Sequence, residues 1–205
     1  DTTRQVAEIG IGFALTKDGI IAIPSALFDK GEEFAIGTRA GSYYTLTILE
    51  RDVTSGIALA EAGAPLALAE KEAGATEDTA AVIVDLAKEN ATAGAARFTD
   101  AQFADSGKIK LGQTAIALGI FGAEPRIILG AVSGFGFAEG GTAKEKHLAV
   151  LYTTLGAESL YNGGPLLDTG GKLMGGTLFG AGQTGTAVSS DVAKTLLAKV
   201  IEGKE

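Results

Sequence analysis

Short hydrophobic runs separated by glycine-containing turns dominate the chain. Each run predicts a β-strand, because strands are short, rich in β-branched and aromatic residues, and bounded by turn residues. The expected strands are 10–15, 20–23, 33–37, 43–49, 113–119, 126–135, 148–154, 165–167 and 173–178. Within 43–49, hydrophobic residues alternate with threonines, which is the period of two of a strand with two different faces. Regular strands joined by Gly-rich turns predict an all-β barrel or sandwich.

The hydrophobic period changes at the C-terminal end of the chain. Hydrophobic residues there recur at helical spacing, which predicts a helix over Ser190–Glu202. Ser189 or Ser190 would cap its N-terminus, and Asp191 lies in the first turn, where a negative charge is favourable.

The stretch of about 62–102 fits the strand pattern least well, because it is rich in Ala and Glu. Val82-Ile83-Val84 is short and apolar and is a candidate strand, whereas Ala87-Lys88-Glu89 favours a helix. We interpret the stretch as an enlarged connecting loop. The alternative is a partner-binding elaboration, since long loops on rigid scaffolds often carry function.

Composition and charge narrow the function classes. The chain has 205 residues, 46% hydrophobic and 20% charged, which is enough for one large or two small folded domains. A net charge of −8 argues against nucleic acid and anionic lipid as partners. The absence of cysteine excludes thiol catalysis and cysteine-ligated zinc, and a single histidine argues against a histidine metal site. We therefore expect no metal and no cofactor.

Five segments, in chain order, carry motifs of one known family. They are 10–22, 41–52, 103–119, 130–136 and 160–166. The first reads GIGFALTKDGIIA and the last reads LYNGGPL, beside the family patterns G-S-G-F-x-[IV]-x-x-D-G and G-[ND]-S-G-G-P-[LV]. Together they resemble the HtrA/DegP group of trypsin-like serine proteases.

The resemblance implies a fold and a division of the chain. The fold is two perpendicular six-stranded antiparallel β-barrels followed by a short C-terminal helix. Residues 1–105 would form the N-terminal barrel, with the enlarged loop at about 62–102. Residues 106–205 would form the C-terminal barrel and the helix, and the two barrels would make one protease-like unit.

The same resemblance implies that the catalytic triad is lost. The family's His falls on Ala26, its Asp on Gly56 and its Ser on Asn162. An amide has no oxygen that can be deprotonated to attack a carbonyl, and no base remains to activate one. The oxyanion-hole glycine falls on Leu160, where a left-handed leucine would cost on the order of 1–2 kcal/mol. We expect that hole to be collapsed or reshaped.

The leading hypothesis is therefore a catalytically inactive domain that acts as a peptide-binding, scaffolding or regulatory module. In this family the cleft between the barrels holds an extended peptide, by pairing with a strand edge beside a side-chain pocket. The candidate cleft residues are Asn162, Thr177, Leu178 and Phe179.

Two alternatives stay open. The first is a serine-type endopeptidase with a relocated site, in which Ser25 or Ser159 works with His147, the single histidine. The bland interpretation of His147 is a solvated side chain in a charged loop. The second alternative is an engineered inactive form of a working protease. It is disfavoured because three triad positions differ together with Leu160.

The resemblance also implies partners and a compartment. The expected partner is an extended peptide or a protein, and the expected location is extracytoplasmic: secreted, periplasmic or membrane-tethered. The chain starts at Asp1 without a signal-peptide pattern, which suggests a mature form or an excised domain. The identity of the partner, homo-oligomer formation and a flanking transmembrane segment or PDZ domain stay open.

Overall fold

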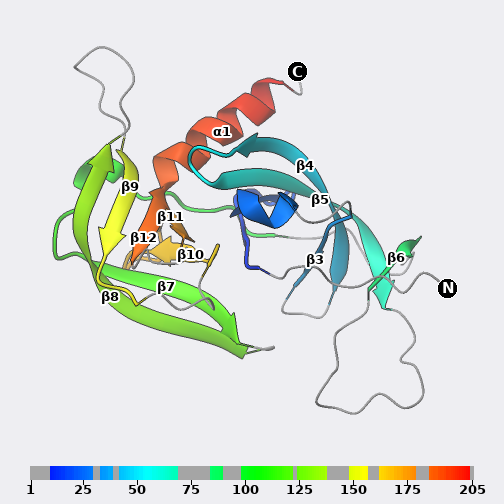
Figure 1. Cartoon of the computed structure of the whole chain (residues 1–205), viewed down its shortest axis with the longest axis horizontal. Coiled ribbons are helices and arrows are strands. Elements are labelled where there is room, and N and C mark those ends of the chain that lie inside the picture. The colour runs from blue at the N-terminus through cyan, green and yellow to red at the C-terminus, as the bar shows by residue number, and fades with distance from the viewer. Residues whose placement is uncertain are drawn as a thin grey trace.

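The computed structural model describes residues 10–29, 33–38, 42–68, 84–89, 98–121, 124–137, 148–156, 162–178 and 185–203. These residues form two antiparallel β-sheets and one α-helix (Figure 1). The first sheet contains β1 (Phe13–Ala14), β2 (Ile20–Pro24), β3 (Ala35–Gly37), β4 (Tyr43–Asp52), β5 (Ile57–Leu68) and β6 (Val84–Glu89). The second contains β7 (Thr114–Phe121), β8 (Glu124–Phe137), β9 (Leu148–Thr153), β10 (Pro165–Leu167), β11 (Leu173–Leu178) and β12 (Thr186–Ser189).

The first sheet has the order β1-β2-β5-β4-β3, with β6 paired to β5. Both predicted hairpins are present, β1 with β2 and β3 with β4, and Gly19 in the first turn has a φ of +93° that favours glycine. The sequence predicted a closed barrel here. In the part of the chain that the structure describes, the sheet stays open, because its short end strands β1 and β3 pair with one neighbour each.

The predicted loop at about 62–102 is partly strand. β5 continues to Leu68, so its last seven residues, 62–68, belong to the sheet. The segment 87–89, which favours a helix locally, lies in β6 and pairs with β5. Pairing with a neighbouring strand overrides weak helix propensity at this point. Residues 69–83 and 90–97 lie outside the described part of the chain.

The second sheet closes into a barrel with the order β10-β11-β12-β9-β8-β7, as predicted. Its core contains fully buried Leu151, Leu166 and Met174. The turn between β10 and β11 is fixed by Asp168, whose carboxylate accepts backbone hydrogen bonds from Gly170 and Lys172 at 2.8 Å each. This is the Asx-type turn chemistry that allows a tight hairpin.

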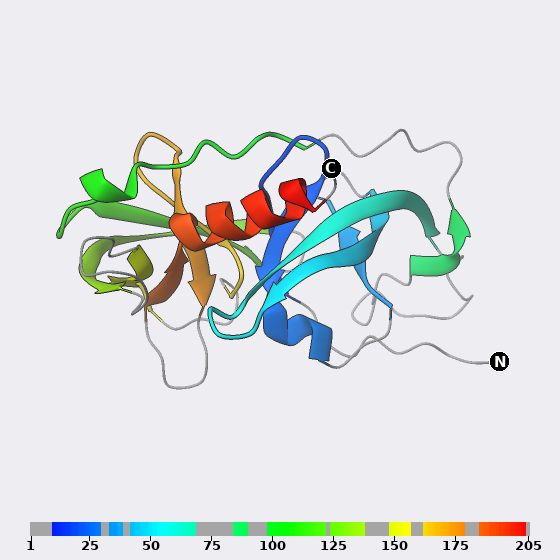
Figure 2. The ribbon, with the colours of Figure 1, turned by 90° about the horizontal axis from the view of Figure 1, so that it is seen from above.

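The helix α1 (Ser190–Glu202) has the predicted bounds. Ser189 is its N-cap, and the serine Oγ accepts a hydrogen bond from the Asp191 N–H at 3.2 Å. The buried face of the helix, which includes Leu196 and Val200, packs against Leu59 of the first sheet. Figure 2 shows the helix leaving the second barrel and lying against the first sheet.

The connection between the two sheets is held by backbone hydrogen bonds. The Ala101 N–H donates to Leu15 at 3.0 Å, and the Leu173 N–H donates to Gln102 at 2.7 Å. A short 3₁₀ helix, η3 (Ser106–Lys108), follows. Both sheets and the helix are therefore joined into one unit, while the boundary between 105 and 106 stays a prediction.

Candidate functional site

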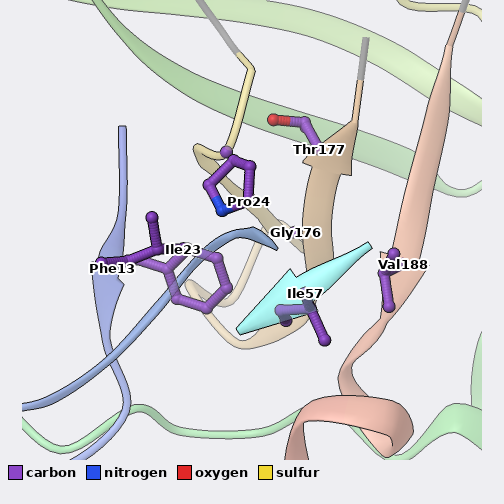
Figure 3. A pocket seen from close by; sticks show the side chains of 8 residues that line it. Phe13, Ile23, Pro24, Ile57, Gly176, Thr177 and Val188 are labelled. Atoms are coloured by element: carbon purple, nitrogen blue, oxygen red, sulfur yellow. The ribbon is translucent and has the colours of Figure 1, made fainter. Parts of the chain in front are cut away.

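A small apolar cavity lies between the two sheets (Figure 3). Its volume of about 10 Å³ leaves room for about one water molecule. Half of its lining comes from the first sheet and half from the second barrel. The lining residues are Phe13, Ile23, Pro24, Ile57, Gly163, Gly176, Thr177 and Val188. None of these side chains ionises, so the cavity is a packed junction without charge.

The three predicted triad positions lie close along the chain to this lining. Ala26 is in the 3₁₀ helix η1 (Ser25–Asp29), two residues after Pro24. Gly56 directly precedes Ile57, and Asn162 directly precedes Gly163. The structure therefore brings the three chain segments to one junction, although they are far apart in sequence. Whether the three positions correspond to a lost triad stays a prediction.

The first two segments are also bonded to each other. The Ser25 N–H donates to the Gly56 carbonyl at 2.9 Å. Gly56 has a φ of +76°, and its N–H donates to the Asp52 carbonyl at 3.0 Å in a turn between β4 and β5. The Asp52 carboxylate accepts from the Thr54 N–H at 3.0 Å. This left-handed turn suits glycine, and a larger residue at 56 would be strained.

The segment after Asn162 is pressed against the first sheet. Gly163 has a φ of +86°, and a Cβ on it would collide with the Ile11 carbonyl and lie 2.6 Å from the Pro24 ring. The Gly163 N–H donates to the Thr177 carbonyl at 2.7 Å. The half-buried Asn162 therefore begins a tight turn whose next residue has to be glycine.

Thr177 is a structural member of the junction. Its side chain is fully buried, and its hydroxyl donates to the Gly164 carbonyl at 2.9 Å. Its backbone N–H donates to the same carbonyl at 2.8 Å. The side chain is therefore not accessible to a bound peptide. Leu178 ends β11 opposite Thr186, and the backbone alone of Leu178 is described.

Several other predicted residues lie outside the described part of the chain. They are His147, Ser159, Leu160 and Phe179. The expected collapse of the oxyanion hole at Leu160 and a relocated serine–histidine pair therefore stay predictions. Ser25 is described and is buried.

Sequence reasoning missed the contact that joins the halves, which is the Pro24 ring against Gly163. The signal available was the position of both residues next to triad-like motifs. Among the described residues, no group of acidic, histidine or cysteine side chains could hold a metal ion. The helix α1 is too short and too polar to cross a membrane, and no other described helix qualifies.

A second, open depression of about 230 Å³ lies on the second barrel side. Its lining carries both charge signs, from Asp105, Lys108, Asp168 and Lys172. The hydrogen bond and charge of Lys108, whose ammonium lies 3.0 Å from the Asp105 carboxylate, lower the pKa of Asp105. These exposed charges lie apart from the interbarrel cavity, whose lining shares no residue with the depression.

Comparison with solved structures finds two that share this fold. The HtrA-type protease AlgW with a decapeptide has a TM-score of 0.65 and 17% identity, and the match covers 94% of this chain and 51% of that one. A serine-to-alanine variant of AlgW with a decapeptide has a TM-score of 0.67 and 15% identity, and the match covers 96% and 52%. This chain thus spans about half the length of the structures it matches. No protein-family model and no curated protein matches the chain. The predicted trypsin-like, HtrA-type protease fold is confirmed.

Proposed function

We propose that this domain, which has the HtrA-type protease fold, is catalytically inactive and binds an extended peptide or protein segment. The observation that carries the proposal is the set of residues at the triad-like positions: Ala26, Gly56 and Asn162. Acyl transfer by this fold needs a hydroxyl nucleophile, an imidazole base and a carboxylate that orients the base. A methyl group, a hydrogen atom and an amide supply none of these.

The local packing supports the equivalence of the three positions. Residues within two positions of each line one cavity, and Ser25 is hydrogen-bonded to Gly56 across the first sheet. A protease of this fold assembles its site at the same kind of junction, from both barrels. The left-handed φ of Gly56 further supports inactivity, because it disfavours a carboxylate-bearing residue there.

Peptide binding is the activity that the fold suggests once hydrolysis is gone. The AlgW structures that share this fold each contain a decapeptide. Strand-edge pairing gives affinity without any catalytic group. Thr177 would contribute through packing alone, because its hydroxyl and N–H are bonded to Gly164. Asn162, Leu178 and Phe179 remain the candidate contact residues. We further propose that the domain works outside the cytoplasm, as HtrA-type proteases do.

The inactivity is tested by incubating the purified domain with casein and with peptide substrates, beside labelling with a serine-directed phosphonate. We expect no cleavage above buffer and no labelled band. Cleavage that disappears in both Ser25→Ala and His147→Ala variants would favour the alternative, a relocated serine site. Cleavage that persists in these variants would also contradict the proposal and would require another nucleophile.

Restoring the triad tests the backbone argument. The variant Ala26→His/Gly56→Asp/Asn162→Ser is expected to stay inactive in a peptide cleavage assay, because residue 56 would have to adopt a strained conformation. Turnover in this variant but not in the parent would contradict the backbone argument, and it would support the alignment of the three positions.

Binding is tested by titrating the isotope-labelled domain with a panel of extended decapeptides and following amide shifts by NMR. We expect shifts at Asn162 and Leu178, and none at the remote helix residue Ile201. The Asn162→Ala variant should weaken binding by about 2- to 13-fold, the value of one hydrogen bond, while Val53→Ala in a distant turn should not. Absence of shifts with every peptide, or equal weakening by both variants, would refute this cleft as the binding site.

A further inference from the structure

The strand pair β7–β8 extends past its neighbours in the second barrel as a two-stranded ribbon (Figure 1). β10 pairs with β7 at Ile116 and Ala117, and β9 pairs with β8 from Val132 onward. Within the described residues, the segments 118–121 and 124–130 therefore have no strand on their outer edges. We call these two segments the ribbon.

One face of the ribbon and its base is apolar and exposed. Ile116 lies opposite Leu129, and Leu118 lies opposite Ile127, so four branched side chains share one face. Ile127 and Leu129 expose 65% and 69% of their surface. The opposite face turns inward, since Ala117 is fully buried. We call Ile116, Leu118, Ile127 and Leu129 the apolar face.

This arrangement is unfavourable for an isolated molecule in water. A two-stranded ribbon is marginally stable without a cover, and grouped exposed apolar side chains mark interaction sites. The outer edge of β8 is a poor docking strand, because Pro125 has no N–H to donate. The face of the ribbon is therefore a better contact surface than the edge of β8.

We propose that the apolar face binds the same face of a second copy of this chain, around a two-fold axis. The four side chains carry no charge, so two copies with a net charge of −8 each can meet there without placing like charges in contact. A two-fold interface has to be self-complementary, and an uncharged aliphatic patch meets that requirement. Anionic membranes are repelled by the same net charge. This inference is independent of the proposed peptide cleft.

The size of the face predicts a weak dimer. With strands about 4.8 Å apart and a rise of about 3.4 Å per residue, two strands of eight residues present a face of roughly 10 by 27 Å. That is well below the area of about 800 Å² per partner in a standard stable interface. We therefore expect a dissociation constant between about 10 μM and 1 mM.

Analytical ultracentrifugation of the full 205-residue chain tests the proposal. The mass should rise from monomer towards dimer as the concentration increases from about 5 μM to 1 mM. Association should strengthen when salt is raised, because screening reduces the repulsion between the two negative copies. A monomer at every concentration, or a dimer that salt dissociates, would overturn the proposal.

Variants locate the contact. Ile127→Lys and, as a milder change that keeps strand propensity, Leu129→Thr should each weaken dimerisation, the lysine by about tenfold or more. The control Val53→Lys alters a residue that is 71% exposed in the turn between β4 and β5, and it should leave dimerisation unchanged. Circular dichroism checks that each variant is folded.

Three results would refute the apolar face as a dimer contact. The first is an unchanged dimer in both face variants, and the second is an equal loss in the control. The third is a monomer that floats with neutral lipid vesicles through Ile127 and Leu129, which would make a lipid surface the occupant.

Discussion

Gly163 is the residue whose side chain this fold can least enlarge. Its α-carbon is packed against the Ile11 carbonyl and the Pro24 ring, and its φ of +86° is left-handed. Gly112 has a similar φ of +76°, but no atom lies within 4 Å of the position that a Cβ would take. The two glycines therefore separate backbone strain from collision.

This pair gives a first prediction. Gly112→Ala should lower the free energy of unfolding by about 1–2 kcal/mol, the cost of a left-handed residue. Gly163→Ala should cost clearly more, because collision is added to the strain and the collision partner is backbone. Urea unfolding of both variants measures the difference. Equal losses would show that the two halves do not meet at Gly163 as described.

A second prediction concerns the pH dependence at Asp105. Lys108 lowers the pKa of this carboxyl below its ordinary value of 3.8, first by its hydrogen bond and then by its charge. A lowered pKa in the folded state means that the pair stabilises the fold above the ordinary pKa. That contribution is lost as the pH falls through the lowered value. Because both groups are exposed, salt should weaken the effect.

The measurement is an NMR titration of the Asp105 carboxyl carbon. In Lys108→Met its pKa should rise towards 3.8, while Lys199→Met on α1 should leave it unchanged. A pKa that stays low in Lys108→Met would mean that another group, such as the Gly107 N–H that donates at 3.1 Å, controls this carboxyl.

At the residue scale, the sequence predicted the chain segments of the candidate site but not their contacts. The motifs pointed to Ala26, Gly56 and Asn162, and all three segments meet at one junction. The collision partner of Gly163 was not predictable, because a contact between Pro24 and Gly163 depends on how two sheets dock. Local patterns carry no information on such long-range packing.

Among the elements, α1 carries the clearest energetic prediction. Leu196 is buried against the first sheet, whereas Leu197 is only partly buried. Leu196→Ala should cost about 2–5 kcal/mol of unfolding free energy, and Leu197→Ala should cost less. Chemical denaturation of both variants checks this order. A reversed order would mean that the helix presents a different face to the sheet.

Element boundaries followed the sequence where turn and cap residues fixed them. The bounds of β10, β11 and α1 agree with the prediction, because Asp168 and Ser189 make local hydrogen bonds that end one element or start the next. Prediction failed where pairing between strands decided the outcome. Segment 87–89 is strand, and bulges in β4 interrupt its alternation so that Ile48 is exposed.

For the whole molecule, we predict that the two sheets unfold together. The helix that follows β12 supplies core residues to the first sheet, and the interbarrel connection is bonded to both Leu15 and Leu173. Thermal unfolding followed at Tyr44 in the first sheet and at Tyr152 in the second by NMR should therefore give coincident transitions. Leu196→Ala should shift both midpoints. Two separate midpoints would mean that each sheet is stable alone.

At this scale the sequence predicted the closed second barrel but not the open first sheet. Closure depends on whether the end strands reach each other, which strand-length patterns do not determine. The two-residue β1 and the three-residue β3 are too short to make that visible in a hydrophobic pattern.

The docking of α1 on the first sheet has a consequence for biosynthesis. Ala193, Leu196 and Val200 are made last, yet they complete a core that includes Leu15 and Ile20, which are made near the start. A ribosome that has released only the first half of the chain has therefore released a sheet with an uncovered apolar surface. The nascent chain would have to remain unaggregated until its final helix emerges, which makes this domain a natural client for chaperones that hold growing polypeptides.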